Sequence, residues 1–311
     1  MPWKHWSTER LGVALAVLAA LGFSFKAIFV KLAYAVPQAV PVDAITLLSL
    51  RMVFALPVFA WVGWRASRGA PPLTRGDWLR VSALGLLGYY GASILDFIGL
   101  RTISAGLERL ILFTYPTLTV LIGVLFMGKP LARREVGALI LSYLGIGLAF
   151  FHDLEFAGES TTVLLGAAFV FASSLSYAFY LAGSATMIQR LGAARFSALA
   201  MLVSTAATQL HFLIEQPLSA LAQPLPVYAY GAGMALFSTV LPVFWQSAAI
   251  RRIGSSKAVL IGTLGPVLTI FFGWWILAEP LSLAQIAGAG LVLAGVLLVS
   301  GAKPGKRAAP A

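Results

Sequence analysis

The chain contains no cysteine, only three histidines, and charged residues at only 11% of its 311 positions. The lack of cysteine excludes disulfides, thiol catalysis and cysteine-bound metals. His5, His152 and His211 are scattered near the ends of apolar segments, so we expect no metal site. Soluble domains carry roughly 25% charged residues, and the low charge content therefore excludes an ordinary soluble protein.

Several catalytic motifs are also missing. The sequence has no H-E-x-x-H, no G-x-S-x-G and no G-x-x-x-x-G-K-[ST], so zinc hydrolysis, serine hydrolysis and ATP hydrolysis have no visible basis. Asp96 and Glu108 are a formal carboxylate pair for an intramembrane enzyme, but each has a nearer cation to pair with. Selectivity filters of channels use symmetric rings of side chains, which this asymmetric charge set lacks. We expect neither an enzyme nor a cofactor.

Long apolar segments are present instead. Hydrophobic residues make up 59% of the chain, and a helix needs about 20 apolar residues to cross a bilayer. The sequence predicts an all-α membrane protein with ten transmembrane helices, which we place at residues 11–35, 42–64, 80–100, 104–127, 134–152, 162–187, 195–215, 228–250, 257–278 and 283–301.

The net charge of +11 follows the predicted topology. With the N-terminus in the cytoplasm, the inner loops and ends hold Lys4, Arg10, Arg65, Arg68, Arg75, Arg80, Lys129, Arg133, Arg134, Arg190, Arg195, Arg251, Arg252, Lys257, Lys303, Lys306 and Arg307. The outer loops hold little more than Arg101, and the loop 152–161 is acidic. This bias predicts that both termini lie in the cytoplasm. We expect the membrane to be a bacterial inner membrane. No basic patch with interleaved aromatic residues indicates a nucleic-acid partner.

The chain repeats itself. Residues 101–150 align with residues 251–300 without a gap, and the match pairs Pro116 with Pro266 and Gly123 with Gly273. Each copy holds five predicted helices, an odd number, so the second copy must cross the membrane in the opposite sense. Inverted repeats are typical of secondary transporters, because two similar halves can open alternately to either side. A duplication that only enlarged the bundle is the alternative.

The tract KAVLIGTLGPVLTIFFGWWILAEPLSLAQIAGAG, which follows Gly254-Ser255-Ser256, resembles the C-terminal half of an EamA domain. The typical ending of that domain is present as Ala278-Glu279-Pro280-Leu281-Ser282. The first copy departs from it, since Gly128-Lys129-Pro130 has lysine where the acid is usual. The resemblance is to the drug/metabolite transporter superfamily.

This resemblance implies ten helices in two inverted five-helix EamA repeats. It implies a first repeat over residues 11–152, a second over residues 162–301 and a basic cytoplasmic tail over residues 302–311. It also implies a carrier of metabolites or drugs, commonly an exporter, and leaves the substrate open.

Six ionisable residues lie in the outer half of the first repeat: Lys26, Lys31, Arg51, Asp96, Glu108 and Arg109. A charge inside the membrane costs about 2.5–3.5 kcal/mol, so it normally faces the bundle interior and finds a partner. One interpretation is a static ion-pair lock. The other is an outer gate formed by Asp96, Glu108 and Arg109, in which a carboxyl group also carries a coupled proton.

The candidate substrate site combines excess positive charge with aromatic and polar residues near mid-membrane. Lys26 and Arg51 leave a positive potential suited to a carboxylate or phosphate. The further candidates are Tyr89, Tyr90, Tyr177 and Gln246. Pro116 and Pro266 are expected to kink their helices, which is tolerated where backbone lines a cavity.

These features predict a gradient-driven transporter that works by alternating access within the lipid bilayer. The expected substrate is a small amphipathic metabolite, with a carboxylate-bearing one favoured, and export is favoured by the resemblance. A broad drug or cation exporter is the alternative within transport, and an intramembrane enzyme is the alternative outside it. The oligomeric state, monomer or homodimer, stays open.

Overall fold

The computed structural model describes residues 8–39, 41–128, 133–156 and 160–300, and these ranges contain helices, turns and loops but no strand. Eight helices are long and apolar enough to cross a membrane, and two shorter apolar helices complete the ten segments. The predicted all-α membrane fold is therefore confirmed. The predicted tail over residues 302–311, like Lys129-Pro130, lies outside the described residues.

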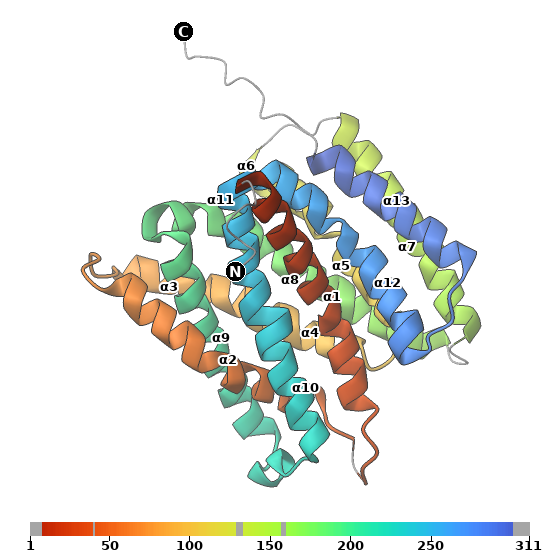
Figure 1. The fold of residues 1–311 in the computed structure, drawn as a ribbon, viewed down its shortest axis with the longest axis horizontal. Helices are drawn as coiled ribbons and strands as arrows, with labels where there is room; N and C mark the ends of the chain where they lie inside the picture. The colour runs from red at the N-terminus through yellow and green to blue at the C-terminus, as the bar shows by residue number, and fades with distance from the viewer. Residues whose placement is uncertain (1–7, 40, 129–132, 157–159, 301–311) are drawn as a thin grey trace.

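The elements follow the order of the predicted segments (Figure 1). In the first half they are α1 Thr8–Tyr34, α2 Ala44–Ser67, α3 Arg75–Gly85, the π-helix η2 Leu86–Gly91, α4 Ala92–Gly99, α5 Ala105–Leu112, α6 Tyr115–Met127 and α7 Arg133–Phe156. In the second half they are α8 Ser160–Leu191, α9 Ala193–Glu215, the 3-10 helix η3 Leu218–Leu221, α10 Leu225–Ala235, the π-helix η4 Leu236–Val240, α11 Leu241–Gly262, α12 Leu264–Leu277 and α13 Leu283–Ser300.

Side-chain caps fix where several helices begin. The Asp43 carboxylate accepts a hydrogen bond from the Thr46 amide at the start of α2. Thr74 and Asp77 form a reciprocal capping box at the start of α3. The Ser104 hydroxyl accepts from the Leu107 amide and starts α5. Such caps satisfy amides that the first helical turn leaves without partners, and they set the ends of the first-half helices.

The irregular parts of the fold repeat at the same offset as the sequence. The π-helices η2 and η4 lie within the predicted helices 80–100 and 228–250, and the sequence pattern predicts no π-helix in either. After α6 and α12 the chain turns left-handed, at Gly128 with φ 63° and at Ala278 with φ 54°. Their amides donate to the carbonyls of Gly123 and Gly273 respectively. The two halves of the fold thus repeat the same irregular features, as expected of two five-helix repeats.

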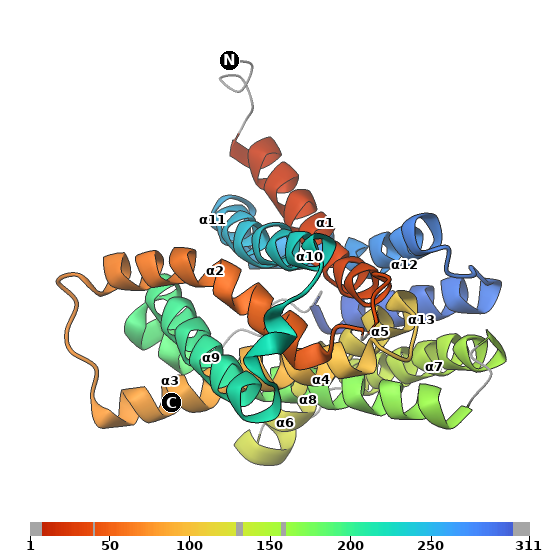
Figure 2. The ribbon, with the colours of Figure 1, turned by 90° about the horizontal axis from the view of Figure 1, so that it is seen from below.

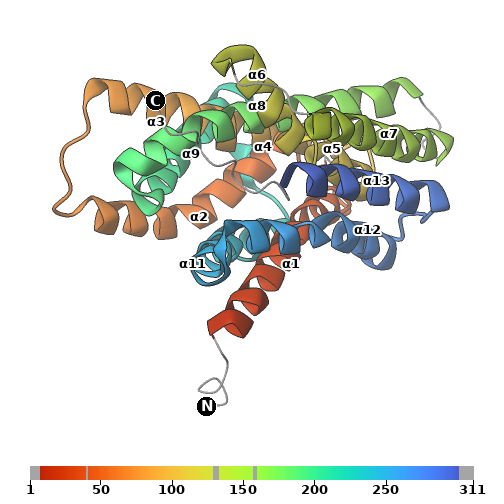
Figure 3. The same cartoon turned by 90° about the horizontal axis from the view of Figure 1, so that it is seen from above.

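Close packing between the halves holds the bundle together. In Figures 1, 2 and 3 α7 and α13 lie side by side at one edge, while α1 lies along α11 and α12, and α2 along α9. The α7–α13 pair meets at Gly145 and Gly288, where a Cβ atom on either glycine would lie 2.4 Å from the carbonyl oxygen of the other. Small residues at such crossings let membrane helices approach backbone to backbone.

Candidate functional site

One ammonium group joins two buried carboxylates at the centre of the site. The Lys26 Nζ atom of α1 lies 2.6 Å from Asp96 Oδ2 on α4 and 2.9 Å from Glu108 Oε1 on α5. The Asp96 and Glu108 side chains are 3% and 0% exposed, and Lys26 is 18% exposed. The sequence had grouped both acids with Arg109, whereas the structure gives both of them Lys26 as ion-pair partner. This contact links three helices of the first repeat.

The two arginines of the predicted cluster stack on phenylalanines instead. The buried Arg51 guanidinium lies 5.1 Å from the Phe97 ring centre and donates to Ser93 Oγ at 2.8 Å. The Arg109 guanidinium lies 5.2 Å from the Phe113 ring centre. In the part of the chain that the structure describes, neither guanidinium has a carboxylate oxygen within 4 Å. Neither charge is therefore neutralised by a direct ion pair within this described part of the chain.

Arg109 is the more accessible of the two arginines. It is half-buried, whereas Arg51 is 6% exposed. Its Nε atom, like that of Arg51, has no hydrogen-bond partner among the described residues. The guanidinium lies beside Gly265, where a Cβ atom would come within 2.9 Å of Arg109 Nη2. The absence of a side chain at Gly265 therefore leaves room for Arg109 between the two repeats.

Arg109 also lies where membrane helices are interrupted. The membrane-spanning segment formed by α5 and α6 is interrupted at Phe113 and Thr114, just before Pro116. Proline at this position cannot donate to the Leu112 carbonyl, and the Ser174 hydroxyl of α8 donates to that carbonyl at 3.1 Å instead. The second repeat breaks at Thr263, just before Pro266. Both prolines predicted to kink their helices thus follow a break.

The tyrosines divide into two groups. The Tyr177 ring contacts Tyr115 at 5.3 Å and Tyr180 at 5.5 Å between ring centres. The Tyr89 hydroxyl lies 2.9 Å from the Tyr180 hydroxyl. These four rings form an aromatic wall that continues from Phe113, the ring beneath Arg109, through its contact with Tyr115 at 6.1 Å.

The other predicted residues lie apart from this wall. The Tyr90 hydroxyl lies 3.0 Å from His211 Nδ1 on α9, and His211 Nε2 lies 2.8 Å from Glu215 Oε2. Gln246 is half-buried on α11. The structure therefore brings Tyr89 and Tyr177 together, and it places Tyr90 in a separate contact with α9. No group of three possible metal ligands occurs among the described residues.

Glu279 is a functional candidate that reasoning from charge depth did not identify. Its two carboxylate oxygens lie 2.9 and 3.1 Å from the Ala105 amide at the start of α5. Glu279 Oε1 also lies 3.9 Å from Lys31 Nζ at the end of α1. The Ala278–Ser282 ending was the available signal, but it indicated a family and not a contact. The residue joins the two repeats on the side where α1 ends.

The arrangement can hold an anion beside an aromatic surface. Lys26 is neutralised by one carboxylate and leaves the second to offset one of the arginines, so the five charges Lys26, Arg51, Asp96, Glu108 and Arg109 sum to one net positive charge. Inside a bundle this charge is screened much less than at a surface. An arginine fork matches a carboxylate with two parallel hydrogen bonds. The chemistry is that of binding and release.

The chain matches a transporter family and proteins named as transporters along nearly its whole length. The profile of the EamA-like transporter family matches residues 10–151 and again residues 164–301. The uncharacterized transporter YcbK of Bacillus subtilis is 30% identical over 90% of this chain and 89% of its own length. The uncharacterized transporter sll1319 of Synechocystis is 26% identical, with 94% of each chain covered.

Two further similarities are narrower. An aromatic amino acid exporter, YddG of Ancylobacter novellus, is 35% identical over 28% of this chain and 29% of its own length. A solved crystal structure shares the fold with a TM-score of 0.62, at 17% identity over 94% of this chain and 97% of the other.

Proposed function

The chain belongs to the EamA-like transporter family and is an integral, multi-pass membrane transporter, and we propose that it carries a small amphipathic carboxylate by alternating access. The family is one of transporters, and the relatives are named as transporters, which argues against the intramembrane enzyme. The basic inner loops support a bacterial inner membrane with both termini in the cytoplasm.

The observation that carries this proposal is the Arg109 guanidinium, which has no carboxylate oxygen within 4 Å among the described residues. Lys26 is engaged by two carboxylates, so it is a weaker candidate for the substrate than its charge alone suggested. Arg109 is half-buried and lies in the last turn of α5, directly before the break between α5 and α6. Its Nε atom has no hydrogen-bond partner among the described residues. Broken helices near mid-membrane are where secondary transporters bind substrates. We assign the substrate carboxylate to Arg109, with Arg51 adding to the positive potential.

The aromatic wall indicates the other end of the substrate. Arg109 contacts Phe113, Phe113 contacts Tyr115, and Tyr115 contacts Tyr177. A substrate whose carboxylate binds Arg109 therefore extends the rest of its atoms along these three rings. Aromatic pairs gain about 0.5–1.5 kcal/mol beyond burial. The named substrate of the YddG relative supports an aromatic side chain. Its name also supports export as the direction.

Two contacts on one side support an outer gate. Lys26 joins α1, α4 and α5, and Glu279 joins the α12–α13 connection to the start of α5. The Glu279 contact must loosen for the proposed repeats, residues 11–152 and 162–301, to separate on that side. The Lys26 contact must loosen as well if α1, which packs along α11 and α12, moves with the second repeat away from α4 and α5. In this account the structure is closed to the outside, and the Lys26 contact works as a gate and not only as a lock.

The coupling ion is proposed to be the proton. Asp96 Oδ1 and Glu108 Oε2 are buried without hydrogen-bond partners among the described residues. Proton uptake by either acid removes one of the two charges that hold Lys26, which links protonation to opening of the gate. Asp96→Asn with Glu108→Gln tests this link, because transport that keeps its pH dependence in this double variant contradicts it.

Ligand-induced stabilisation of purified protein tests the substrate class. A ligand at 100 times its Kd raises the free energy of unfolding by about 2.7 kcal/mol. We expect stabilisation by phenylalanine and by indole carboxylates, and none by their amides. Arg109→Gln should abolish the shift, Arg109→Lys should weaken it, and Arg101→Gln, an exposed arginine nearby, should leave it intact. Stabilisation by hydrophobic cations alone would instead support the drug or cation exporter.

A further inference from the structure

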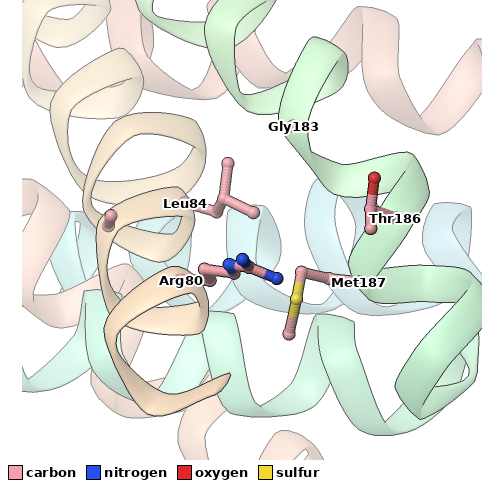
Figure 4. A pocket seen from close by; sticks show the side chains of 6 residues that line it. Arg80, Leu84, Gly183, Thr186 and Met187 are labelled. Carbon is pink, nitrogen blue, oxygen red and sulfur yellow. The ribbon is translucent and has the colours of Figure 1, made fainter. Parts of the chain in front are cut away.

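A groove lies between α3 and α8 (Figure 4), on the parts of these helices that carry Arg80 and, nearby in sequence, Arg75 and Arg190. It has a volume of about 420 Å³ and is lined by Arg80, Ala83, Leu84, Gly183, Thr186 and Met187. Figure 4 shows Arg80 and Leu84 on α3 facing Thr186 and Met187 on α8. The lining is apolar apart from one guanidinium and one hydroxyl group.

The groove opens towards the surroundings of the bundle and not towards the proposed substrate site. Thr186 follows Tyr177 by nine positions, and at about 100° per residue the two side chains leave α8 on opposite faces. Tyr177 faces Tyr115 and Tyr180 inside the protein. Thr186 and Arg80 are exposed. In a membrane, this outer face of α3 and α8 meets lipid.

The shape of the groove follows from small residues. A Cβ atom at Gly183 would lie 2.7 Å from Leu84 Cδ2, so the leucine side chain packs directly onto the α8 backbone. Ala83 adds little bulk on the other helix. Met187 is 1% exposed and closes the floor. The result is an apolar groove of the kind that an acyl chain fills.

Arg80 adds a positive charge to this groove. The nearest acid along the helix, Asp77, is engaged by Arg190, with Arg190 Nε 2.7 Å from Asp77 Oδ1. Asp77 Oδ2 also accepts from the Thr74 hydroxyl at 2.8 Å. Across the part of the chain that the structure describes, Arg80 has no carboxylate oxygen within 4 Å. Its guanidinium is therefore available to an external anion.

We propose that this groove binds an acidic phospholipid, with the phosphate on Arg80 and an acyl chain against Leu84, Gly183 and Met187. A guanidinium binds phosphate with two parallel hydrogen bonds, and the Thr186 hydroxyl supplies a further donor. Basic pockets between membrane helices on the cytoplasmic side bind such headgroups. The site is separate from Arg109 and does not depend on the proposed substrate.

Native mass spectrometry of the full chain tests the proposal. The protein is first purified with phosphatidylcholine and then exchanged into phosphatidylglycerol, and the spectra report which lipid stays bound. Wild type should retain phosphatidylglycerol over phosphatidylcholine, and Arg80→Gln should reduce this retention about tenfold, since a lost charged hydrogen bond of about 1.4 kcal/mol corresponds to that factor. Thr186→Trp, which fills the groove but keeps Arg80, should release the lipid as well. Arg134→Gln, at the exposed start of α7 on the same side, is the matched control and should retain it.

The source of the phosphate is separated by a second probe. Glycerol 3-phosphate carries the headgroup chemistry without acyl chains, and it should not displace the lipid at equal concentration. Equal lipid retention by wild type and both groove variants overturns the proposal. Displacement by glycerol 3-phosphate overturns it too, because Arg80 would then be a site for soluble anions. If Arg80→Gln does not fold, the Thr186→Trp result decides alone.

Discussion

Replacing Lys26 by methionine tests the central ion bridge. The substitution keeps most of the side-chain length but removes the ammonium that lies 2.6 Å from Asp96 and 2.9 Å from Glu108. Both carboxylates are almost fully buried, so the variant leaves two acids in an apolar bundle without their cation. Loss of one partner of a buried pair costs about 3–5 kcal/mol. We expect Lys26→Met to lower the free energy of unfolding by about 3 kcal/mol. This is the lower end of that range, because the Lys26 side chain is itself 18% exposed.

The expected rescue makes this prediction specific. Lys26→Met combined with Asp96→Asn and Glu108→Gln removes all three charges, so it should be more stable than Lys26→Met alone. Lys31→Met is the matched control on the same helix. Its ammonium lies 3.9 Å from Glu279 and both side chains are more accessible, so its pair with Glu279 should be worth at most about 1 kcal/mol.

The assay is equilibrium unfolding in mixed micelles of a denaturing detergent, followed by tryptophan fluorescence. Stability of Lys26→Met within about 1 kcal/mol of wild type would refute the reasoning. So would a triple variant less stable than Lys26→Met, because removing unpaired buried charges should not destabilise the protein further.

Three further predictions address the irregular parts of the fold. Ala278→Gly removes the steric cost of a side chain at the left-handed φ of 54° and should raise the free energy of unfolding by about 1 kcal/mol in the same assay. An unchanged unfolding midpoint would contradict this. Ser174→Ala removes the hydroxyl that donates to the Leu112 carbonyl, and it should cost about 1–3 kcal/mol, with Ser174→Thr as the conservative control. Glu279→Gln weakens the cap on Ala105, and it should increase labelling of an introduced outer-side cysteine by an impermeant thiol reagent in the otherwise cysteine-free chain. Unchanged labelling would argue against an outer gate.

The membrane fold could be predicted because apolar length alone decides which segments cross a bilayer. The pairing of Pro116 with Pro266 also indicated where the helices break. The π-helix over Leu86–Gly91 could not be predicted, because its cause lies in another helix. There the Ser176 hydroxyl donates to the Leu87 carbonyl, and a Cβ atom at Gly88 would lie 2.3 Å from Tyr180 Cγ.

The candidate site was predicted in composition but not in pairing. Position along a helix gives the depth of a charge, so Lys26, Asp96, Glu108 and Arg109 were all assigned to the outer half. Depth does not give the rotation of each helix about its axis. That rotation turns Lys26 towards both acids and turns Arg109 towards Phe113 and the other repeat. The partners of Glu279 likewise depend on how the two repeats meet.

Counterflow in proteoliposomes measures the central claim most directly. Vesicles loaded with unlabelled phenylalanine and diluted into trace labelled phenylalanine should accumulate label with wild type and with Arg101→Gln. Arg109→Gln should accumulate none, although it inserts and unfolds like wild type. Equal counterflow by wild type and Arg109→Gln would contradict the assignment of the substrate carboxylate to Arg109. Counterflow of the amide but not of the carboxylate would contradict the proposed substrate class.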